Sequence, residues 1–249
     1  MLRAAVRWRV PVAPGESRWC RAGPGAAAEA EAEPEPIRAS SPGLRRRLRG
    51  LVVVRGGFVS PEEAAELEAE LEPLLRGRRY QFDHWDGAIS GYRETERGRW
   101  GPAGRAVLGR LSAEFPPERP PRPLVHVLDL HRRGHVAPHV DSVKFCGCTL
   151  AGLSLLSAAV LRLRSCRTPA QSLELLLEPR SLYVLRGAAR YEFTHEILRD
   201  EESFFGERRV PRGRRLALIY RNDPPDLTPD PLSDLSTFIG GSAPPAAPQ

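Results

Sequence analysis

Two histidines and an aspartate in this sequence have the residue types and spacing of a metal site. His139 and Asp141 form a His-x-Asp triplet beside a strand-like segment, and His195 ends a later one. Residues i and i+2 of a β-strand point to the same face, so an imidazole and a carboxylate at this spacing can bind one metal ion together. Two histidines with one carboxylate leave coordination positions open and suit non-haem Fe(II) oxygen chemistry. We interpret these three residues as candidate iron ligands, with hydrogen-bonded structural histidines as the alternative.

The remaining histidines are weaker candidates. His84-Trp85-Asp86 repeats the triplet, but it lies in a turn-like, aromatic-rich stretch outside the strand-rich part of the chain. His126, His131 and His135 closely precede His139, and we assign them structural or surface roles. Cys146-Gly147-Cys148 offers two thiols without a second pair, which does not make a zinc site.

Two arginines near the end of the strand-rich region have the spacing of an anion site. Arg215 and Arg221 flank the apolar run Leu216 to Tyr220 and lie six positions apart. An even separation puts both side chains on one face of a strand. Each guanidinium can bind a carboxylate there through paired N–H groups. A metal site and a dicarboxylate site on neighbouring strands are together stronger evidence for a functional site than either feature alone.

The elements that must hold these side chains are mostly strands. From Leu124 onward the hydrophobic period is two and predicts seven strands. They are 124–130, 153–156, 160–164, 173–177, 181–185, 190–194 and 216–220. A further short β-like run covers 51–54. No helical run of ten residues separates the seven strands, so we expect a mainly β fold with flanking α, a jelly roll fronted by N-terminal helices.

Helix signals precede the strands. Ser60-Pro61-Glu62-Glu63 combines an N-cap, a proline at the first helical position and a capping-box glutamate. The helix that it predicts has a stripe of leucines and ends at Gly77. The stripe consists of Leu67, Leu71, Leu74 and Leu75. A second helix is expected around 103–114.

The order of these residues along the chain resembles the order found in the AlkB family of Fe(II)- and 2-oxoglutarate-dependent dioxygenases. The resemblance begins with His139-x-Asp141, His195, Arg215 and Arg221, and longer strings are similar to the mitochondrial branch of that family. The strings are Arg79-Tyr80, Asp83 to Asp86, Arg93 to Glu96, His126 to Leu130, Pro138 to Phe145 and Thr194 to Arg209. Together they cover about 51–221 and leave out both ends of the chain.

The resemblance implies a double-stranded β-helix in which His139, Asp141 and His195 hold Fe(II). It also implies that Arg215 and Arg221 bind the carboxylates of 2-oxoglutarate and that Tyr183 adds a hydroxyl group. Three positions depart from the family pattern, because relatives that repair nucleic acids have polar residues there that contact 2-oxoglutarate. In this chain they are Leu128, Leu130 and Ala217. Because the polar contacts at these positions are missing, Tyr183 becomes a stronger candidate for binding 2-oxoglutarate.

The activity implied by the resemblance is oxidation of a C–H bond with O2, while 2-oxoglutarate is converted to succinate. We expect hydroxylation of a protein or small-molecule substrate, and the resemblance links the chain to alkylation-induced programmed necrosis and to fatty-acid and energy metabolism. Demethylation of N-methylated mitochondrial RNA is the alternative. A non-catalytic interaction protein on a jelly-roll scaffold is the second alternative.

Two features bear on the RNA alternative. Aromatic residues between 79 and 100 are candidates for a stacking lid over the iron, or for packing residues at the edge of the β core. They are Tyr80, Phe82, Trp85, Tyr92 and Trp100. The basic run from Arg208 to Arg215 is equally compatible with a phosphate-binding track and with a solvated turn.

The ends of the chain differ in composition from its middle. Of 25 prolines, 13 fall in 1–42 and 224–249. The first 28 residues hold five arginines and one acidic residue, which is typical of a mitochondrial transit peptide, with an unaddressed basic tail as the alternative. We therefore expect a transit peptide and disordered linker in 1–42, a dioxygenase domain in 43–223 and a disordered tail in 224–249. The expected location is the mitochondrial matrix.

Composition narrows the class of protein further. Four cysteines in 249 residues argue against a secreted disulfide framework. The longest uncharged stretch, Phe145 to Leu161, has 17 residues, fewer than the about 20 that a membrane-spanning helix needs. A net charge of +6 is compatible with nucleic-acid binding. However, Lys144 is the single lysine, and a general preference for arginine explains the charge equally well. We expect a monomer.

Overall fold

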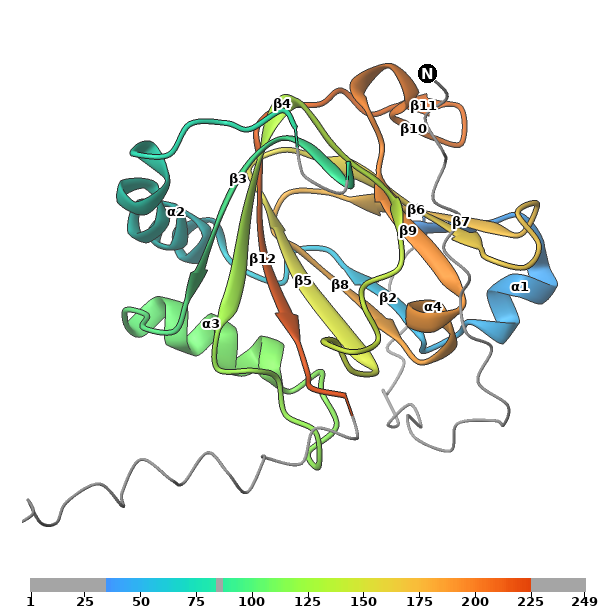
Figure 1. Cartoon of the computed structure of the whole chain (residues 1–249), viewed down its shortest axis with the longest axis horizontal. Helices are drawn as coiled ribbons and strands as arrows, with labels where there is room; N and C mark the ends of the chain where they lie inside the picture. Colours follow the sequence, from blue (N-terminus) through green and yellow to red (C-terminus); the bar gives the residue numbers. More distant parts are fainter. Residues whose placement is uncertain (1–34, 84–86, 225–249) are drawn as a thin grey trace, which may run out of the picture.

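The computed structural model describes residues 35–83 and 87–224. Most of the expected transit peptide, all but the first residue of the expected tail and the His84-Trp85-Asp86 triplet lie outside the described residues. The described chain is built mainly of strands, with helices on both flanks (Figure 1). None of its helices is long and apolar enough to cross a membrane.

One ten-stranded antiparallel sheet forms the body of the fold. Its strands are β1 (Ile37–Ala39), β2 (Val52–Arg55), β3 (Ile89–Arg97), β4 (Val125–His139), β5 (Thr149–Leu155), β6 (Ala159–Ser165), β7 (Ser172–Leu177), β8 (Ser181–Arg186), β9 (Phe193–Ile197) and β12 (Arg215–Arg221). Their order is β1-β7-β6-β9-β4-β12-β5-β8-β2, and β3 pairs with β4 beside this path. A separate hairpin joins β10 (Phe204–Phe205) to β11 (Arg208–Arg209) after a short 3-10 helix, η1 (Asp200–Glu202).

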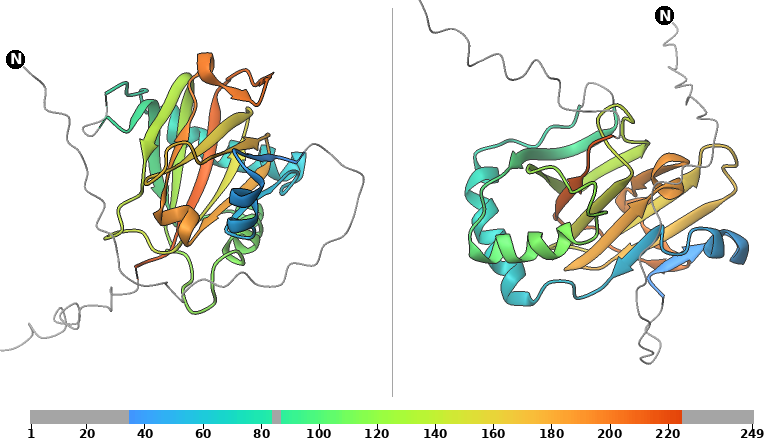
Figure 2. Two further views of the ribbon diagram at one scale, coloured as in Figure 1. Left: turned by 90° about the vertical axis from the view of Figure 1, so that its right-hand side faces the viewer. Right: turned by 90° about the horizontal axis from the view of Figure 1, so that it is seen from below.

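The sheet folds over so that its two halves face each other, as Figure 2 shows from two sides. The 15-residue strand β4 belongs to both halves, because its first part pairs with β12 and its end pairs with β9. One inner core contains Leu161 and Leu175 from the β7-β6-β9 half together with Leu150 and Ile219 from the β12-β5-β8 half. This closed, strand-rich arrangement confirms the expected jelly roll.

Two helices cover the outer face of one half. α2 (Pro61–Arg76) and α3 (Pro102–Ser112) pack on β5, β8 and β12 through a second apolar core that includes Leu71, Val107 and Leu218. Two shorter helices, α1 (Pro42–Arg47) and α4 (Ala188–Tyr191), lie elsewhere along the chain. The capping box at the start of α2 forms as predicted, since the Ser60 hydroxyl accepts from the Glu63 N–H and the Glu63 carboxylate accepts from the Ser60 N–H.

Some expectations about the elements were wrong. Leu74 does not belong to the buried stripe of α2, because 42% of it is exposed while its neighbours Leu71 and Leu75 are fully buried. Residues 190–194 do not form one strand: α4 includes Arg190, and β9 begins only at Phe193. Four strands, β1, β3, β10 and β11, were not predicted. β1 pairs with β7 although it precedes residue 43, so the fold begins within the segment assigned to the linker.

The burial pattern of α2 makes a direct prediction. Leu71→Ala should lower the free energy of unfolding by about 2–5 kcal/mol, because it leaves a cavity between helix and sheet. Leu74→Ala, three residues along the same helix, should change it by about 0.5 kcal/mol or less. Urea unfolding of the two variants measures both effects. Equal losses would contradict the placement of the helix.

Candidate metal centre

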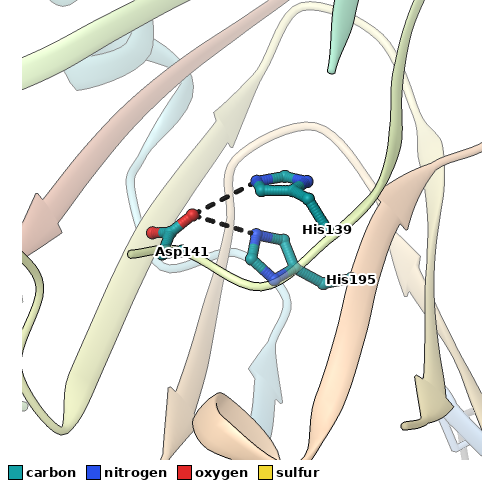
Figure 3. Close-up of side chains that lie close together, drawn as sticks. All are labelled: His139, Asp141 and His195. Atoms are coloured by element: carbon teal, nitrogen blue, oxygen red, sulfur yellow. Dashed lines mark hydrogen bonds and ion pairs between the residues drawn. The ribbon is translucent and has the colours of Figure 1, made fainter. Parts of the chain in front are cut away.

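His139, Asp141 and His195 lie together at the junction of β4 and β9 (Figure 3). One ligand atom from each residue can be chosen so that all lie within 4.8 Å of one another. His139 Nε2 is 3.2 Å from Asp141 Oδ1, and His195 Nε2 is 3.7 Å from the same oxygen. This is the one cluster of three or more potential metal-binding side chains in the described residues.

The strand register, together with a loop, brings the three residues together. His139 is the last residue of β4 and stands directly opposite His195 of β9. Asp141 lies two residues beyond the end of β4. The expectation that His139 and Asp141 share a strand face was therefore incomplete, because the carboxylate is carried by the loop after the strand.

A fully buried arginine holds that loop. Arg190, in α4, donates from Nη2 to the backbone carbonyls of Asp141 at 2.9 Å and Cys146 at 3.3 Å. Its Nε and Nη1 have no hydrogen-bond partner in the described structure. Sequence reasoning missed Arg190, since a contact from a guanidinium to a distant backbone carbonyl leaves no spacing signal.

Charge interactions keep the carboxylate ionised. Burial by itself raises the pKa of Asp141, but the Arg221 guanidinium, whose Nε donates to Asp141 Oδ2 at 2.7 Å, and the hydrogen bond with His139 hold it well below its usual value. Burial and the neighbouring His139 lower the pKa of His195 to about 3, so His195 is neutral at physiological pH. The pKa of His139 is raised, because its hydrogen bond and charge interaction with Asp141 outweigh burial.

The donor set fits a metal cation. His139 Nδ1 lies 2.9 Å from the Ala137 carbonyl oxygen, which only accepts, so Nδ1 carries a proton. With Nδ1 protonated, Nε2 faces the Asp141 carboxylate oxygen at 3.2 Å, and either a proton or a metal ion must lie between these two acceptor atoms. A cation between them satisfies both. Nδ1–H bonding to a backbone carbonyl is also the usual way to orient a metal-binding histidine.

The predicted anion-binding residues lie on β12, in the half of the sheet that faces the half containing β9. Arg215 and Arg221 lie on the inner face of β12, as their even spacing predicts, and Ala217 and Ile219 between them belong to the inner core. Arg215 is 1% exposed, and its Nε donates to the Ser154 hydroxyl at 3.0 Å. Its Nη2 is buried and has no partner in the described structure.

Tyr183 lies against this pair of arginines. Burial lowers the pKa of Arg215, and the Tyr183 hydroxyl partly offsets that effect. Gly152 of β5 stands opposite Tyr183 of β8, and a Cβ atom on Gly152 would come 2.4 Å from the tyrosine hydroxyl oxygen. A glycine at this position therefore leaves the space that the phenol ring occupies. Ser154, two residues further along β5, was not singled out from the sequence.

The three positions that depart from the family pattern are buried and apolar. Leu128, Leu130 and Ala217 all belong to the inner core, where Leu130 pairs with Arg215 and Leu128 pairs with Ala217. They supply no polar contact to the arginines. His126, to which we gave a structural or surface role, instead lies 3.2 Å from Arg221 through its Nδ1.

The aromatic residues considered for a lid have different surroundings. Trp100 is buried in the outer core with the helices, and Tyr92 is buried in the inner core. Tyr80 donates to Asp129 at 3.1 Å, and Phe82 is 54% exposed. Trp85 lies outside the described residues. Two of the four described aromatics, Tyr92 and Trp100, therefore serve packing, which was one of the two interpretations.

The basic run before β12 is largely neutralised within the molecule. Its ion pairs are Arg208 with Glu178 at 2.9 Å, Arg209 with Asp200 at 2.8 Å, and Arg214 with Glu72 at 2.8 Å and Asp129 at 2.9 Å. Arg212 is buried and donates to the Leu198 carbonyl. These contacts compete with phosphate for the same side chains, although the exposed pairs of Arg208 and Arg209 are weak.

Comparisons with known proteins agree with this geometry. Residues 79–221 match a family model described as the 2OG-Fe(II) oxygenase superfamily. The chain is 57% identical over 194 residues to proteins of Bos taurus and Mus musculus named alpha-ketoglutarate-dependent dioxygenase alkB homolog 7, mitochondrial. Each alignment covers 78% of this chain and 88% of the relative. A prolyl-4-hydroxylase from Pseudomonas putida has a similar fold, with a TM-score of 0.53 and 12% identity over 73% of this chain and 97% of that one.

The close approach of Gly152 and Tyr183 can be tested by a double-mutant cycle. Gly152→Ala should destabilise the protein by about 1–3 kcal/mol, because the new methyl group overlaps the phenol ring. The same substitution in a Tyr183→Ala background should cost less, since the overlapping atoms are gone. Chemical denaturation of the four proteins gives the coupling. An equal cost in both backgrounds would show that the strain arises elsewhere.

Proposed function

The chain belongs to the AlkB family within the 2OG-Fe(II) oxygenase superfamily, and from this premise we propose which residues hold its cofactors and which substrates it oxidises. It is an oxidoreductase that depends on Fe(II), 2-oxoglutarate and O2. His139, Asp141 and His195 bind the iron. Arg215, Arg221 and Tyr183 bind 2-oxoglutarate. The substrate is a protein or a small molecule, and the product is hydroxylated.

The facing acceptors of His139 and Asp141 support the iron assignment. Asp141 brings one negative charge, and His195 is neutral because of its burial, so no proton has to leave it when a metal binds. The Ala137 carbonyl orients the His139 ring, and the Arg221 guanidinium orients the Asp141 carboxylate. Neither group is itself a proposed ligand of the metal.

Unpartnered buried N–H groups support the 2-oxoglutarate assignment. Arg215 Nη2 has no acceptor in the described structure, and a buried charged donor without a partner is costly unless a ligand supplies one. A second buried guanidinium lies close by, since burial and the charge of Arg215 lower the pKa of Arg212 to about 10. Two buried cations in an apolar interior favour an anion. Arg221, at the other end of β12, is suited to the second carboxylate of a dicarboxylic acid.

The chemistry combines the cofactors with this setting. When bound, iron, 2-oxoglutarate and O2 supply the power to hydroxylate an unactivated C–H bond, with release of succinate and carbon dioxide. The chain contributes position and exclusion of water. Arg215 and Tyr183 act inside the apolar core, where hydrogen bonds to an anion are stronger than in water.

The internal pairing of the basic run carries the proposal for the substrate class. A nucleic-acid substrate needs unpaired cations along its backbone and aromatic faces on which a base can stack. Arg208, Arg209 and Arg214 are held by carboxylates instead. Phe82 is the exposed aromatic among the lid candidates in the described segment. A protein or small-molecule substrate requires neither a row of unpaired cations nor aromatic faces for stacking.

The cofactor assignment predicts a specific loss. A His139→Ala, Asp141→Ala double variant should bind Mn(II) too weakly to measure and form no succinate from 2-oxoglutarate with Fe(II). His135→Ala removes a histidine of the same strand outside the cluster and should keep both properties. Calorimetry with the full-length proteins gives the metal affinity, and their melting temperatures check the fold. Unchanged metal binding in the double variant would overturn the assignment.

The substrate proposal predicts the form of the product. The full-length enzyme with Fe(II) and 2-oxoglutarate should add the mass of one oxygen atom to a mitochondrial protein or metabolite and release no formaldehyde. N-methylated RNA should give no formaldehyde beyond that of the double variant. Mass spectrometry and a formaldehyde assay read both reactions in parallel. Formaldehyde from RNA in step with succinate would establish demethylation instead.

We extend the proposal to the location, because the relatives in cattle and mouse are named mitochondrial and the first 28 residues are rich in arginine. A reporter fused to residues 1–42 should reach the mitochondrial matrix and resist protease after the outer membrane is ruptured. The same fusion with Arg3, Arg7 and Arg9 changed to Glu should stay in the cytosol. Cytosolic retention of the unchanged fusion would contradict the prediction.

A further inference from the structure

A line of polar contacts leads from the candidate metal centre to the outside of the sheet. Arg221 Nε donates to Asp141 Oδ2 at 2.7 Å, and Arg221 Nη1 lies 3.2 Å from His126 Nδ1. His126 Nε2 in turn lies 2.7 Å from Glu94 Oε2. These residues come from β12, β4 and β3, and the Asp141 loop closes the line. None of the roles assigned above explains His126 or Glu94.

The positions of the residues follow from the strand register. His126 stands opposite Ile219 of β12 on one side and opposite Glu96 of β3 on the other. Arg221 and Glu94 are each two residues from those partners, so their side chains share the face of His126. The exposed fractions of the side chains are 7% for Asp141, 22% for Arg221, 19% for His126 and 38% for Glu94. The outer end is open to solvent and the inner end is not.

The chemistry of the three groups fixes where the histidine proton lies. A guanidinium has only donors, so the contact between Arg221 and His126 requires a lone pair on Nδ1. The neutral ring then carries its proton on Nε2, where the Glu94 carboxylate accepts it. Glu94 therefore favours the tautomer that can accept from Arg221. In the other tautomer two N–H groups would face each other, and Arg221 would lose one of its anchors.

Arg221 has few other anchors. Its side chain makes hydrogen bonds to Asp141 and His126 in the described structure. A long arginine side chain loses considerable conformational entropy when it becomes ordered. A hydrogen bond that already orders the side chain lowers the entropy that is lost when a ligand binds. His126 thus restricts the guanidinium before any ligand arrives.

We propose that His126, held in its Nε2–H tautomer by Glu94, is a positioning residue that orients Arg221 for 2-oxoglutarate. This inference rests on the proposed function, in which Arg221 binds a carboxylate of the co-substrate. His126 acts through Arg221 and does not itself touch the metal. It fills a role that the leucines and alanine at the three departing positions cannot take.

Substitutions at His126 separate positioning from general stability. His126→Leu removes the acceptor, whereas His126→Asn keeps an oxygen near the position of Nδ1. The dissociation constant of 2-oxoglutarate, measured by calorimetry on full-length protein loaded with Mn(II), should rise about tenfold in His126→Leu, the cost of about one hydrogen bond to a charged group. His126→Asn should regain most of the affinity. The KM for 2-oxoglutarate should rise in His126→Leu while kcat changes little.

Controls keep the test decisive. His135→Leu replaces another partly buried histidine of β4 and should leave the affinity for 2-oxoglutarate unchanged. The Mn(II) affinity of His126→Leu should stay within about twofold of wild type, because its effect reaches Asp141 only through Arg221. Equal affinity for 2-oxoglutarate in wild type and His126→Leu, or an equal loss in His135→Leu, would overturn the inference. Absence of 2-oxoglutarate binding in the wild type would instead overturn the proposed function.

A second measurement does not depend on the folding of any variant. Nitrogen-15 spectra of the histidine rings in the wild-type protein report the tautomer of each ring, and the signals missing in His126→Asn identify His126. At slightly alkaline pH the inference requires a protonated Nε2 and an unprotonated Nδ1. The opposite tautomer would refute it. Glu94→Leu should weaken the preference for the Nε2–H form and raise the dissociation constant of 2-oxoglutarate in the same direction as His126→Leu.

Discussion

The ion pair between Arg221 and the buried Asp141 is the interaction on which the candidate metal centre depends. Asp141 is 8% exposed, and an isolated carboxylate at that depth would take up a proton rather than stay ionised. The guanidinium at 2.7 Å prevents this and fixes the direction of the carboxylate toward the two histidines. Because Arg221 is also a residue assigned to 2-oxoglutarate, one side chain links the metal end of the site to the co-substrate end. A change that breaks the hydrogen bond between Arg221 and Asp141 should therefore alter both ends of the site.

The jelly roll makes such a pair possible because one strand is buried on both of its faces. Leu216, Leu218 and Tyr220 of β12 pack under α2 and α3, while Arg215, Ala217 and Ile219 face the inner core. The helices thus remove water from the outer face, and the opposite half of the sheet removes it from the inner face. Charged groups in that interior need partners, which Ser154 and Asp141 supply in part. The remaining unpartnered N–H groups of Arg215 are what a dicarboxylate can satisfy.

The sequence allowed most of the strands and the site to be predicted, because both follow from local patterns. Alternation of apolar residues identified β4 to β8 and β12, and the capping box identified α2. β3 escaped because Tyr-Arg-Glu-Thr-Glu-Arg is a polar run whose pairing with β4 depends on tertiary contacts such as the Arg93–Asp129 ion pair. Residues 190–194 were misassigned because Arg190 is turned inward to a loop 49 positions away, which no periodicity reports. His126 was undervalued for the same reason: its neighbours Arg221 and Glu94 come from other strands.

Many arginines of this chain have structural roles, which the net charge alone does not reveal. A net charge of +6 suggests a basic surface, yet many of the described arginines are held by carboxylates or carbonyls of the same chain. Arg214 bridges Glu72 of α2 to Asp129 of β4, and Arg93 of β3 reaches the same Asp129. Such bidentate and shared contacts suit a planar guanidinium better than a lysine ammonium. The arginines therefore serve to tie helices and strands to the sheet, and a positive total does not by itself make a surface for phosphates.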